Sequence, residues 1–277
     1  SQKIQLKKGI ISRDGEPIGK MEGNATLLKG TDLSILSIEG ATVMSITSPR
    51  KTFFLYDPIM YYHIQFIPLN KTVSFVPDKF LYSEKNLVEF LFDNIGKDFL
   101  TKDGLNAGLV DKFITDKDQS QTIARDTTHF SALVRISREK FNEPVTARPL
   151  NSSVQIISRG KKTIQAYGQE TLETFDIVQA NILIGKMTKF YKGDPSLHVN
   201  TIPPSQEVEY VVLRRVSPFT LDGETIEFLN MAKVKSSLST PDITAHCERA
   251  WAKDLKTSDI YSAEHDIASW LISKGCL

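Results

Sequence analysis

The sequence predicts an α+β fold made mainly of antiparallel β meanders in two halves, with a short central helical segment and a helical C-terminal region. Three observations support this prediction. Short stretches in which apolar and polar residues alternate recur at hairpin spacing through residues 3–76 and resume after residue 130. Between them, and again after residue 223, apolar residues return every third or fourth position, which is typical of helices. The third observation is a repeated segment.

The repeated segment covers residues 10–18 and 156–164, which agree at five of nine positions without a gap. In the first copy, Asp14 and Gly15 predict a two-residue type I′ turn, because both central positions of that turn need a positive φ. We therefore expect each half of the chain to begin with a β-hairpin. Two unrelated hairpins built from the same good strand and turn residues would agree equally well, so the repeat speaks to architecture and not to function.

The β-rich N-terminal half is expected to span residues 1–120 and to end in one or two helices. The Ser83 hydroxyl can cap the first of these helices, and Gly96 can end it in the left-handed conformation. A second short helix is predicted over residues 106–114 from its apolar spacing. The polar segment at residues 116–121 has no period and is interpreted as the connection between the halves.

The second β-rich half is expected over residues 121–215, and a helical region packed on the sheets is expected over residues 216–277. The second half is predicted to open with a strand at residues 130–136. In the C-terminal region Thr240 followed by proline and aspartate is a strong helix-start signal. The helices predicted there cover residues 224–236, 240–255 and 262–273.

The charges of the chain are nearly balanced, with 34 Lys and Arg against 33 Asp and Glu. A nucleic-acid-binding surface normally leaves a basic footprint, so we expect no nucleic-acid partner. No apolar run approaches the roughly 18 residues that a membrane-spanning helix needs, so no transmembrane segment is predicted. The chain begins at Ser1 without an initiator methionine, as a mature exported protein or a trimmed chain would.

Cys247 and Cys276 are the only cysteines of the chain, so folding must rest on a hydrophobic core. In an oxidising compartment they could form one disulfide bond between C-terminal helices. The alternative is a buried thiol and a loose thiol near the C-terminus. Cys247 and His265 could also meet as a nucleophile and its base, with Asp266 nearby. The simpler interpretation places Cys247 in the core and His265 on the surface.

Local motifs for phosphate, metal and nucleophile chemistry are missing from the sequence. There is no glycine-rich phosphate loop and no G-x-S-x-G elbow, and the five histidines lack the spacing of metal ligands. We therefore predict no catalytic residue, no metal site and no cofactor. Carboxylates that act together on carbohydrate come from distant strands and leave no local pattern, so a glycoside hydrolase stays an alternative.

The aromatic stretch at residues 51–68 is the best candidate for a binding site. An exposed row formed by Phe54, Tyr56, Tyr62 and Phe66 could bind a sugar, an apolar ligand or a partner protein through large, stiff contact area. Aromatic residues are also good strand formers, and a strand pair buried on both faces would have the same composition. Exposure of these side chains distinguishes the two alternatives.

The opening segment, residues 3–17 (KIQLKKGIISRDGEP), resembles the mature N-terminus of uncharacterised exported proteins of Bacteroidetes. Residues 138–145 and 156–164 are similar to the middle section of that family, and the tail with its internal cysteine is loosely similar. Gln165 and Ala166 replace the glycine expected after the second copy of the repeat. The resemblance implies a periplasmic or secreted location with the signal peptide removed, and it carries no assigned activity.

Together, the resemblance and the missing motifs predict an exported protein that works as a non-enzymatic interaction or envelope-associated module. Its expected partner is another envelope protein, or an apolar or sugar ligand. The first alternative is a hydrolase that acts on carbohydrate with dispersed carboxylates. The second is a protein that binds an apolar or sugar ligand at the aromatic strands of residues 53–66.

Overall fold

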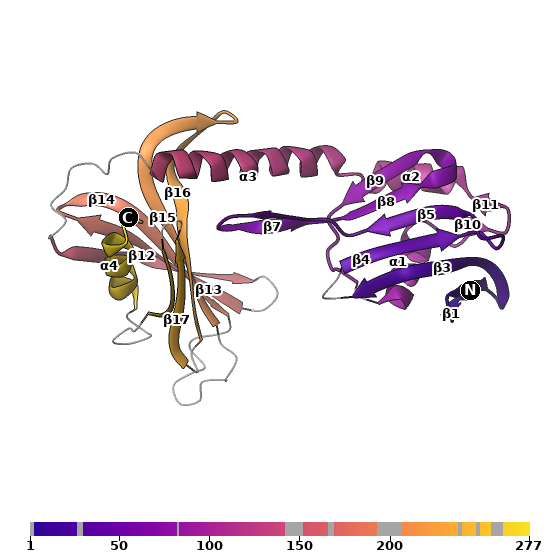
Figure 1. Cartoon of the computed structure of the whole chain (residues 1–277), viewed down its shortest axis with the longest axis horizontal. Coiled ribbons are helices and arrows are strands. Elements are labelled where there is room, and N and C mark those ends of the chain that lie inside the picture. Colours follow the sequence, from indigo (N-terminus) through magenta and orange to yellow (C-terminus); the bar gives the residue numbers. More distant parts are fainter. Residues whose placement is uncertain are drawn as a thin grey trace. The chain divides into compact units, whose positions relative to one another are not determined.

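The computed structural model describes residues 3–26, 30–81, 83–141, 152–165, 169–192, 207–237, 240–247, 250–255 and 263–277. The chain divides into two compact units. Unit 1 comprises Ser1–Phe53 and Asp57–Thr128, and unit 2 comprises Phe54–Tyr56 and His129–Leu277. Each unit contains one seven-stranded sheet (Figure 1). Antiparallel strands dominate the described structure and helices are few, so the β-rich part of the prediction is confirmed.

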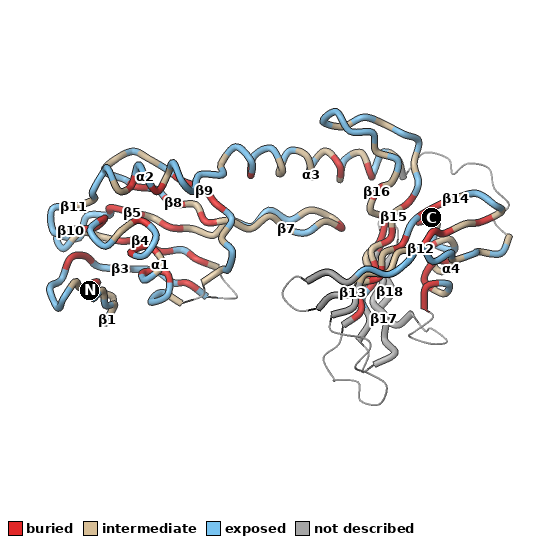
Figure 2. Tube along the Cα trace, turned by 180° about the vertical axis from the view of Figure 1, so that it is seen from behind, coloured by how far each residue is buried: buried red, intermediate tan, exposed pale blue. Residues whose placement is uncertain are grey.

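The sheet of unit 1 has the strand order β1-β2-β3-β4-β5-β8-β9, and every neighbouring pair is antiparallel. Buried positions recur along its strands, as the alternating sequence pattern predicts (Figure 2). A separate two-stranded ribbon pairs β6 (Arg50–Phe53) with β7 (Tyr56–Met60). The strands of the large sheet are β1 (Ile4–Lys7), β2 (Ile10–Arg13), β3 (Glu16–Thr26), β4 (Gly30–Leu36), β5 (Thr42–Thr47), β8 (Tyr62–Phe66) and β9 (Lys71–Phe75).

The predicted turn at Asp14 and Gly15 joins β2 to β3. Both residues have positive φ, 51° and 87°, and the turn pairs Arg13 with Glu16 across the hairpin. Two consecutive positive φ values are the requirement of a type I′ turn, so the first hairpin prediction is confirmed.

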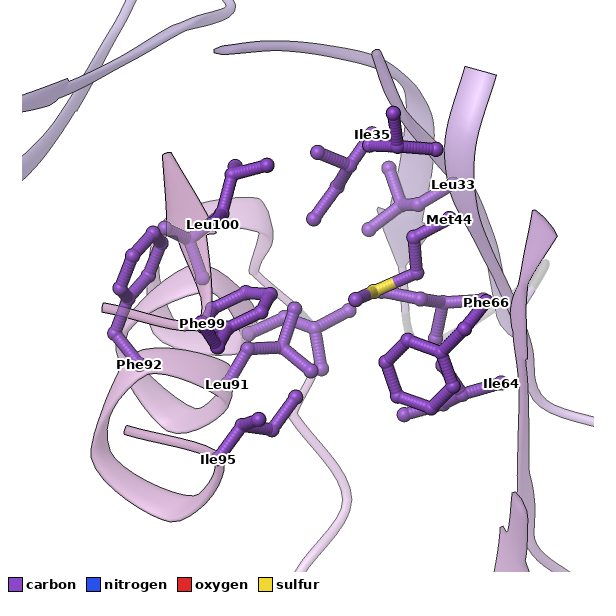
Figure 3. Packing of buried hydrophobic residues seen from close by; sticks show 14 of the residues in the cluster. Leu33, Ile35, Met44, Ile64, Phe66, Leu91, Phe92, Ile95, Phe99 and Leu100 are labelled. Carbon is purple, nitrogen blue, oxygen red and sulfur yellow. The ribbon is translucent and has the colours of Figure 1, made fainter. Parts of the chain in front are cut away.

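The core of unit 1 lies between its sheet and α1 (Glu84–Asn94) with the segment that follows. The predicted cap is present, because the Ser83 hydroxyl accepts a hydrogen bond from the Asn86 N–H at 3.4 Å, and Gly96 after the helix has a positive φ. In Figure 3 side chains from α1 and the segment after it face side chains of the sheet. These core residues include Leu33, Ile35, Met44, Ile64, Phe66, Leu91, Phe92, Ile95, Phe99 and Leu100.

Gly23 lets β3 run very close to β4. Its φ is 104°, and a Cβ added there would lie 2.2 Å from the carbonyl oxygen of Asp32. We expect Gly23→Ala to lower the free energy of unfolding of unit 1 by about 2 kcal/mol or more, since backbone strain and a clash add together. The measurement is the denaturant midpoint at which the β3 and β4 amides lose hydrogen-exchange protection.

Two controls accompany Gly23→Ala. Gly15→Ala also places a side chain at a positive φ but meets no atom within 4 Å, so it isolates the backbone strain from the clash. Both tryptophans, Trp251 and Trp270, belong to unit 2, so the tryptophan fluorescence transition should stay at its wild-type midpoint. Equal effects of Gly23→Ala and Gly15→Ala would contradict the close approach of β3 to β4.

The edge strand β9 is covered by the residues that follow α2 (Ala107–Lys117). The Gln119 N–H donates to the Ser74 carbonyl at 2.7 Å, the Asp118 carboxylate accepts from the Ser74 N–H at 3.1 Å, and the Gln119 side chain accepts from the Val76 N–H at 2.9 Å. The polar connection predicted at residues 116–121 therefore satisfies backbone groups that an edge strand would otherwise expose.

Low pH should weaken the hydrogen bonding of residues 118–119 to the edge strand β9. Burial raises the pKa of Asp118. Hydrogen bonds from the Ser120 hydroxyl and from the N–H groups of Ser74 and Ser120 together lower the pKa by more than burial raises it, so it lies below the ordinary 3.8. A lowered folded-state pKa contributes stability above the unfolded value, and this contribution is lost as pH falls through the folded value.

We therefore expect unit 1 to lose stability below about pH 4, and Asp118→Asn to flatten that loss. The effect should stay below about 1 kcal/mol, because the carboxylate is largely exposed to solvent. Hydrogen exchange of β9 at several pH values measures it, and Asp116→Asn is the control for removing one negative charge. An identical acid profile in Asp118→Asn and the wild type would refute the role of Asp118.

The strand predicted at residues 130–136 is wrong, because these residues lie within α3 (Ser120–Phe141). The segment over which α3 runs contains neither glycine nor proline. Within the wrongly predicted part and just after it, the buried residues Leu133 and Ser137 are four positions apart, on one face of a helix. Over the seven residues 130–136, the apolar residues fit both the spacing of a strand and the spacing of a helix. Only a window longer than these seven residues favours a helix. No helix in the described part of the chain is long and apolar enough to cross a membrane.

The sheet of unit 2 is a simple antiparallel meander, in which each strand pairs with the next one along the chain. One helix, α4 (Glu264–Ser273), follows it and packs against the same hydrophobic core. The strands are β12 (Val154–Gln165), β13 (Gln169–Gln179), β14 (Ile182–Lys192), β15 (Glu207–Leu221), β16 (Glu224–Ser237), β17 (Thr240–Cys247) and β18 (Ala250–Leu255).

The second copy of the repeated segment is not a hairpin. Residues 156–164 lie inside the single strand β12, where the pairing shifts at a bulge between Ser158 and Gly160. The two large sheets also differ in strand order. The agreement between the copies therefore reflects shared strand residues and does not mark two equivalent halves.

The helices predicted at residues 224–236 and 240–255 are also wrong, and the predicted helical C-terminal region is reduced to the short helix α4. Asp222 and Gly223 have φ values of 50° and 83°, so they form the same kind of turn as Asp14 and Gly15 and send β16 back along β15. Pairing within the sheet has overridden the helical spacing of the apolar residues. Only the last prediction, residues 262–273, matches a helix.

Candidate functional site

A row of polar side chains crosses the sheet of unit 2 on its core face. The strand register places Glu173 of β13 opposite Lys189 of β14, and Lys189 opposite Tyr210 of β15. Paired residues of an antiparallel sheet project from the same face, so these three side chains are neighbours. Glu264, the first residue of α4, reaches the same place from the helix. We call these four residues the Lys189 cluster.

The centre of the Lys189 cluster is a buried ion pair. Lys189 is 1% exposed and Glu264 is 8% exposed, and Nζ of Lys189 lies 2.5 Å from Oε1 of Glu264. The Tyr210 hydroxyl donates to the same oxygen at 3.4 Å, and Nζ lies 5.3 Å from the centre of the Tyr210 ring. Removing water from two charges is costly, and only a close, hydrogen-bonded pair offsets that cost.

Glu173 supplies a second carboxylate beside this pair. Its side chain is mostly buried, its Oε1 accepts a hydrogen bond from the Ser158 hydroxyl at 3.3 Å, and its Oε2 lies 3.4 Å from Nζ of Lys161. Both Ser158 and Lys161 belong to β12, the strand at the end of the sheet. Glu173 is thus held from the sheet edge while it faces Lys189 from the adjacent strand.

The helix α4 closes over the core face of the sheet and lies against β12 (Figure 1). Glu264 stands in its first turn, where the positive end of the helix dipole favours a carboxylate. The rest of the buried face of α4 is apolar, and so are the sheet residues that share its hydrophobic core. These residues are Ala263, Ile267, Ala268 and Leu271 from the helix region, and Phe175, Met187, Val208, Val212 and Val234 from the strands.

The segment after α4 is anchored by a disulfide bond. Cys247 of β17 and Cys276 are joined, and both are buried together with the following Leu277. The structure thus contains the bridge, but it joins a strand to the segment after a helix rather than two helices. In this state Cys247 has no thiolate, so the Cys247–His265 nucleophile considered from the sequence is not formed, and His265 is exposed.

No protein-family model, curated protein or solved structure shows significant similarity to this chain. Its function is therefore argued from its own residues. Within the described ranges, no three His, Cys, Asp or Glu side chains are grouped so that they could hold a metal ion.

The four aromatic residues predicted as a binding row do not come together as one exposed surface. Tyr62 and Phe66 are core residues of unit 1, 1% and 0% exposed, and the Tyr62 hydroxyl is hydrogen-bonded to the backbone of Leu81. Phe54 and Tyr56 belong to unit 2. A ligand at these strands could not reach Tyr62 or Phe66.

Tyr56 is packed within unit 2. Its ring lies 5.4 Å from that of Phe130 in α3. Burial raises the pKa of the Tyr56 phenol, and hydrogen bonds with the Ser137 hydroxyl and the Asn230 backbone offset part of this rise. The neighbouring Leu55 carbonyl accepts a hydrogen bond from the Asn230 side chain at 3.1 Å. These contacts give Phe54–Tyr56 a packing role in unit 2.

Two histidines have partners that sequence reasoning missed. Nδ1 of His129 lies 2.6 Å from the Asp222 carboxylate, and Nδ1 of His63 lies 2.9 Å from the Ser74 hydroxyl. A carboxylate on Nδ1 fixes the orientation of an imidazole ring. The first pair also fastens α3 to the turn between β15 and β16, and the second is a cross-strand pair of β8 and β9. The other ring nitrogen of His63, Nε2, lies 3.5 Å from the side-chain amide nitrogen of Gln65, which is not a nucleophile.

The Lys189 cluster was also missed by the sequence reasoning. One signal was present, because Met187 and Lys189 occupy the same face in the alternation of β14, so a lysine stands at an inward position. Its partner Glu264 lies 75 residues further along the chain, and nothing in the local sequence connects them.

Proposed function

We propose that this chain is an exported protein of the cell envelope or surface that works as a non-enzymatic interaction module. The observation that carries this proposal is the disulfide bond between Cys247 and Cys276. Disulfides form and persist in the periplasm, at the cell surface and in secreted proteins, and they are rare in reducing compartments. The resemblance of residues 3–17 to exported proteins of Bacteroidetes agrees with this location.

The strand β12 offers a surface for the interaction. It stands at the end of its sheet, where no described strand pairs with its outer side, so this side is a candidate for pairing with a strand of another protein. Ile157 on this strand is 38% exposed. Beyond it, the bulge at Gly160 and the exposed cations Arg159 and Lys162 interrupt regular pairing. We therefore assign residues 154–158 to contact with an extended segment of another envelope protein.

Alkylation of the protein in its native cells, without reductant, tests the location. We expect both cysteines to be protected from alkylation and the protein to fractionate with the envelope or the periplasm. Two alkylated cysteines in a cytosolic fraction would contradict export.

Chemical cross-linking in intact cells tests the interaction. We expect an adduct of the wild type that is lost in Ile157→Lys and kept in Ile182→Lys, a matched change of another exposed isoleucine in the same sheet. An adduct that both variants keep would exclude the β12 surface. Release of sugar by the purified protein would contradict the non-enzymatic assignment.

A further inference from the structure

We propose that Lys189 and Glu264 become joined by an amide bond between their side chains, formed spontaneously after unit 2 has folded. The site is a covalent modification site within the Lys189 cluster, beneath α4. It does not rest on the proposed interaction of β12, because it follows from the geometry of the cluster alone.

The fold holds the two reacting groups in contact. Nζ of Lys189 lies 2.5 Å from Oε1, an oxygen bonded to the carbon that the amine would attack. Lys189 is fixed in the middle of β14 between two paired strands, and Glu264 is fixed at the first turn of a packed helix. Two reactants held in place in this way can react as if one of them were present at an effective concentration of about 10⁵ M or more.

The short contact inside an apolar core lets the two groups exchange a proton. Both side chains are buried in a core of apolar residues, where a separated charge is costly and water is excluded. Moving one proton across the short contact converts the ammonium and carboxylate into a free amine and a carboxylic acid. The free amine is the nucleophile, and the carboxylic acid has a hydroxyl group that can leave as water.

The step balances without any co-reactant. A bond forms between Nζ of Lys189 and Cδ of Glu264, and the bond between Cδ and one oxygen of Glu264 breaks. The amine gives up two protons in total and the leaving oxygen departs as one water molecule, with no oxidation or reduction. The product is a neutral amide in place of a buried ion pair.

Two neighbours are placed to assist this step. The Tyr210 hydroxyl donates to Oε1 of Glu264, the oxygen that takes the proton from the amine and leaves as water, and it can assist that departure as a hydrogen-bond donor. Glu173 projects beside Lys189 from the adjacent strand, with their Cβ atoms about 5 Å apart in such a pair, and can carry the proton from the amine to the leaving oxygen. Glu173 is thus the assisting carboxylate, and Glu264 is the one consumed.

The intact mass of the folded, full-length protein tests the proposal. After incubation at neutral pH and reduction of the disulfide, we expect the wild type to be lighter than its sequence mass by one water. A tryptic digest should contain one branched peptide that joins Lys189 to Glu264, uncleaved after Lys189. Wild-type protein at its full sequence mass, cleaved after Lys189, would overturn the proposal.

Three variants sharpen the test. Lys189→Arg keeps the positive charge but forms no such amide, so it should retain its full mass; loss of water in this variant would place the reaction elsewhere and overturn the assignment. Glu173→Gln should slow the water loss by roughly 10²-fold or more, and an unchanged rate would refute its role. Lys233→Arg removes the lysine of a more exposed pair in the same sheet, Nζ 3.8 Å from Glu209, and should leave the water loss unchanged. A branched peptide joining Lys233 to Glu209 in the wild type would show that contact alone is enough to form the amide, and would overturn the argument that burial is required.

Discussion

Replacing Lys189 by methionine is expected to lower the free energy of unfolding of unit 2 by about 3–5 kcal/mol. The substitution removes the partner of Glu264 and leaves a carboxylate buried in an apolar core. An amide bond between the two side chains would add to this loss. Both tryptophans of the chain, Trp251 and Trp270, lie in unit 2, so denaturant unfolding followed by tryptophan fluorescence reports on this unit.

Lys233→Met is the matched control, because Lys233 faces Glu209 at 3.8 Å in the same sheet with both side chains about a quarter exposed. Its loss should stay below about 1 kcal/mol. The double variant Lys189→Met with Glu264→Leu should recover the part of the loss that comes from the unpaired buried carboxylate, since a buried pair can be replaced by apolar residues at little cost. Equal losses from Lys189→Met and Lys233→Met would show that the buried pair has no special role.

Removing the disulfide with Cys247→Ala and Cys276→Ala is expected to lower the free energy of unfolding of unit 2 by about 3 kcal/mol. The two cysteines are 29 residues apart, and the bond between them restricts the unfolded chain over that whole distance. The same fluorescence transition measures the loss. Wild type unfolded with and without reductant is the control and should show the same difference. Coincident transitions would mean that the bond does not stabilise unit 2.

The architecture of unit 1 could be predicted from local signals. The Asp14–Gly15 turn, the Ser83 cap and Gly96 each satisfy a backbone requirement within a few residues, so the sequence around them is enough to place them. The strands between them alternate because one face of the sheet is buried and the other is not.

The C-terminal part of the chain shows where local signals fail. The apolar residues of β16 and β17 fit helical spacing, yet both segments are strands of a seven-stranded sheet, which no window of ten or fifteen residues reveals. The Asp222–Gly223 pair was the one local signal for the hairpin, identical in kind to Asp14–Gly15. Giving that turn more weight than the helical spacing would have led to the observed β15–β16 pair.

The Lys189 cluster lay beyond prediction for a related reason. Its members come from β13, β14, β15 and α4, and only the strand register and the packing of the helix bring them together. Tyr62 and Phe66 lie in the core and not in an exposed row, and the sequence could not show this because strand formation and ligand binding call for the same residue types.

Amide hydrogen exchange in α4 tests most directly whether this helix is fastened to the sheet of unit 2. We predict that the amides of Ala268 and Leu271 in the oxidised wild type are protected nearly as strongly as those of Met187 and Val212 in the sheet, since all four residues lie in one core. In Lys189→Met, the hydrogen-exchange protection of the α4 amides should fall more than that of the sheet amides. Rapid exchange throughout α4 in the oxidised wild type, beside a protected sheet, would contradict the fastening of α4 by Glu264 and Cys276.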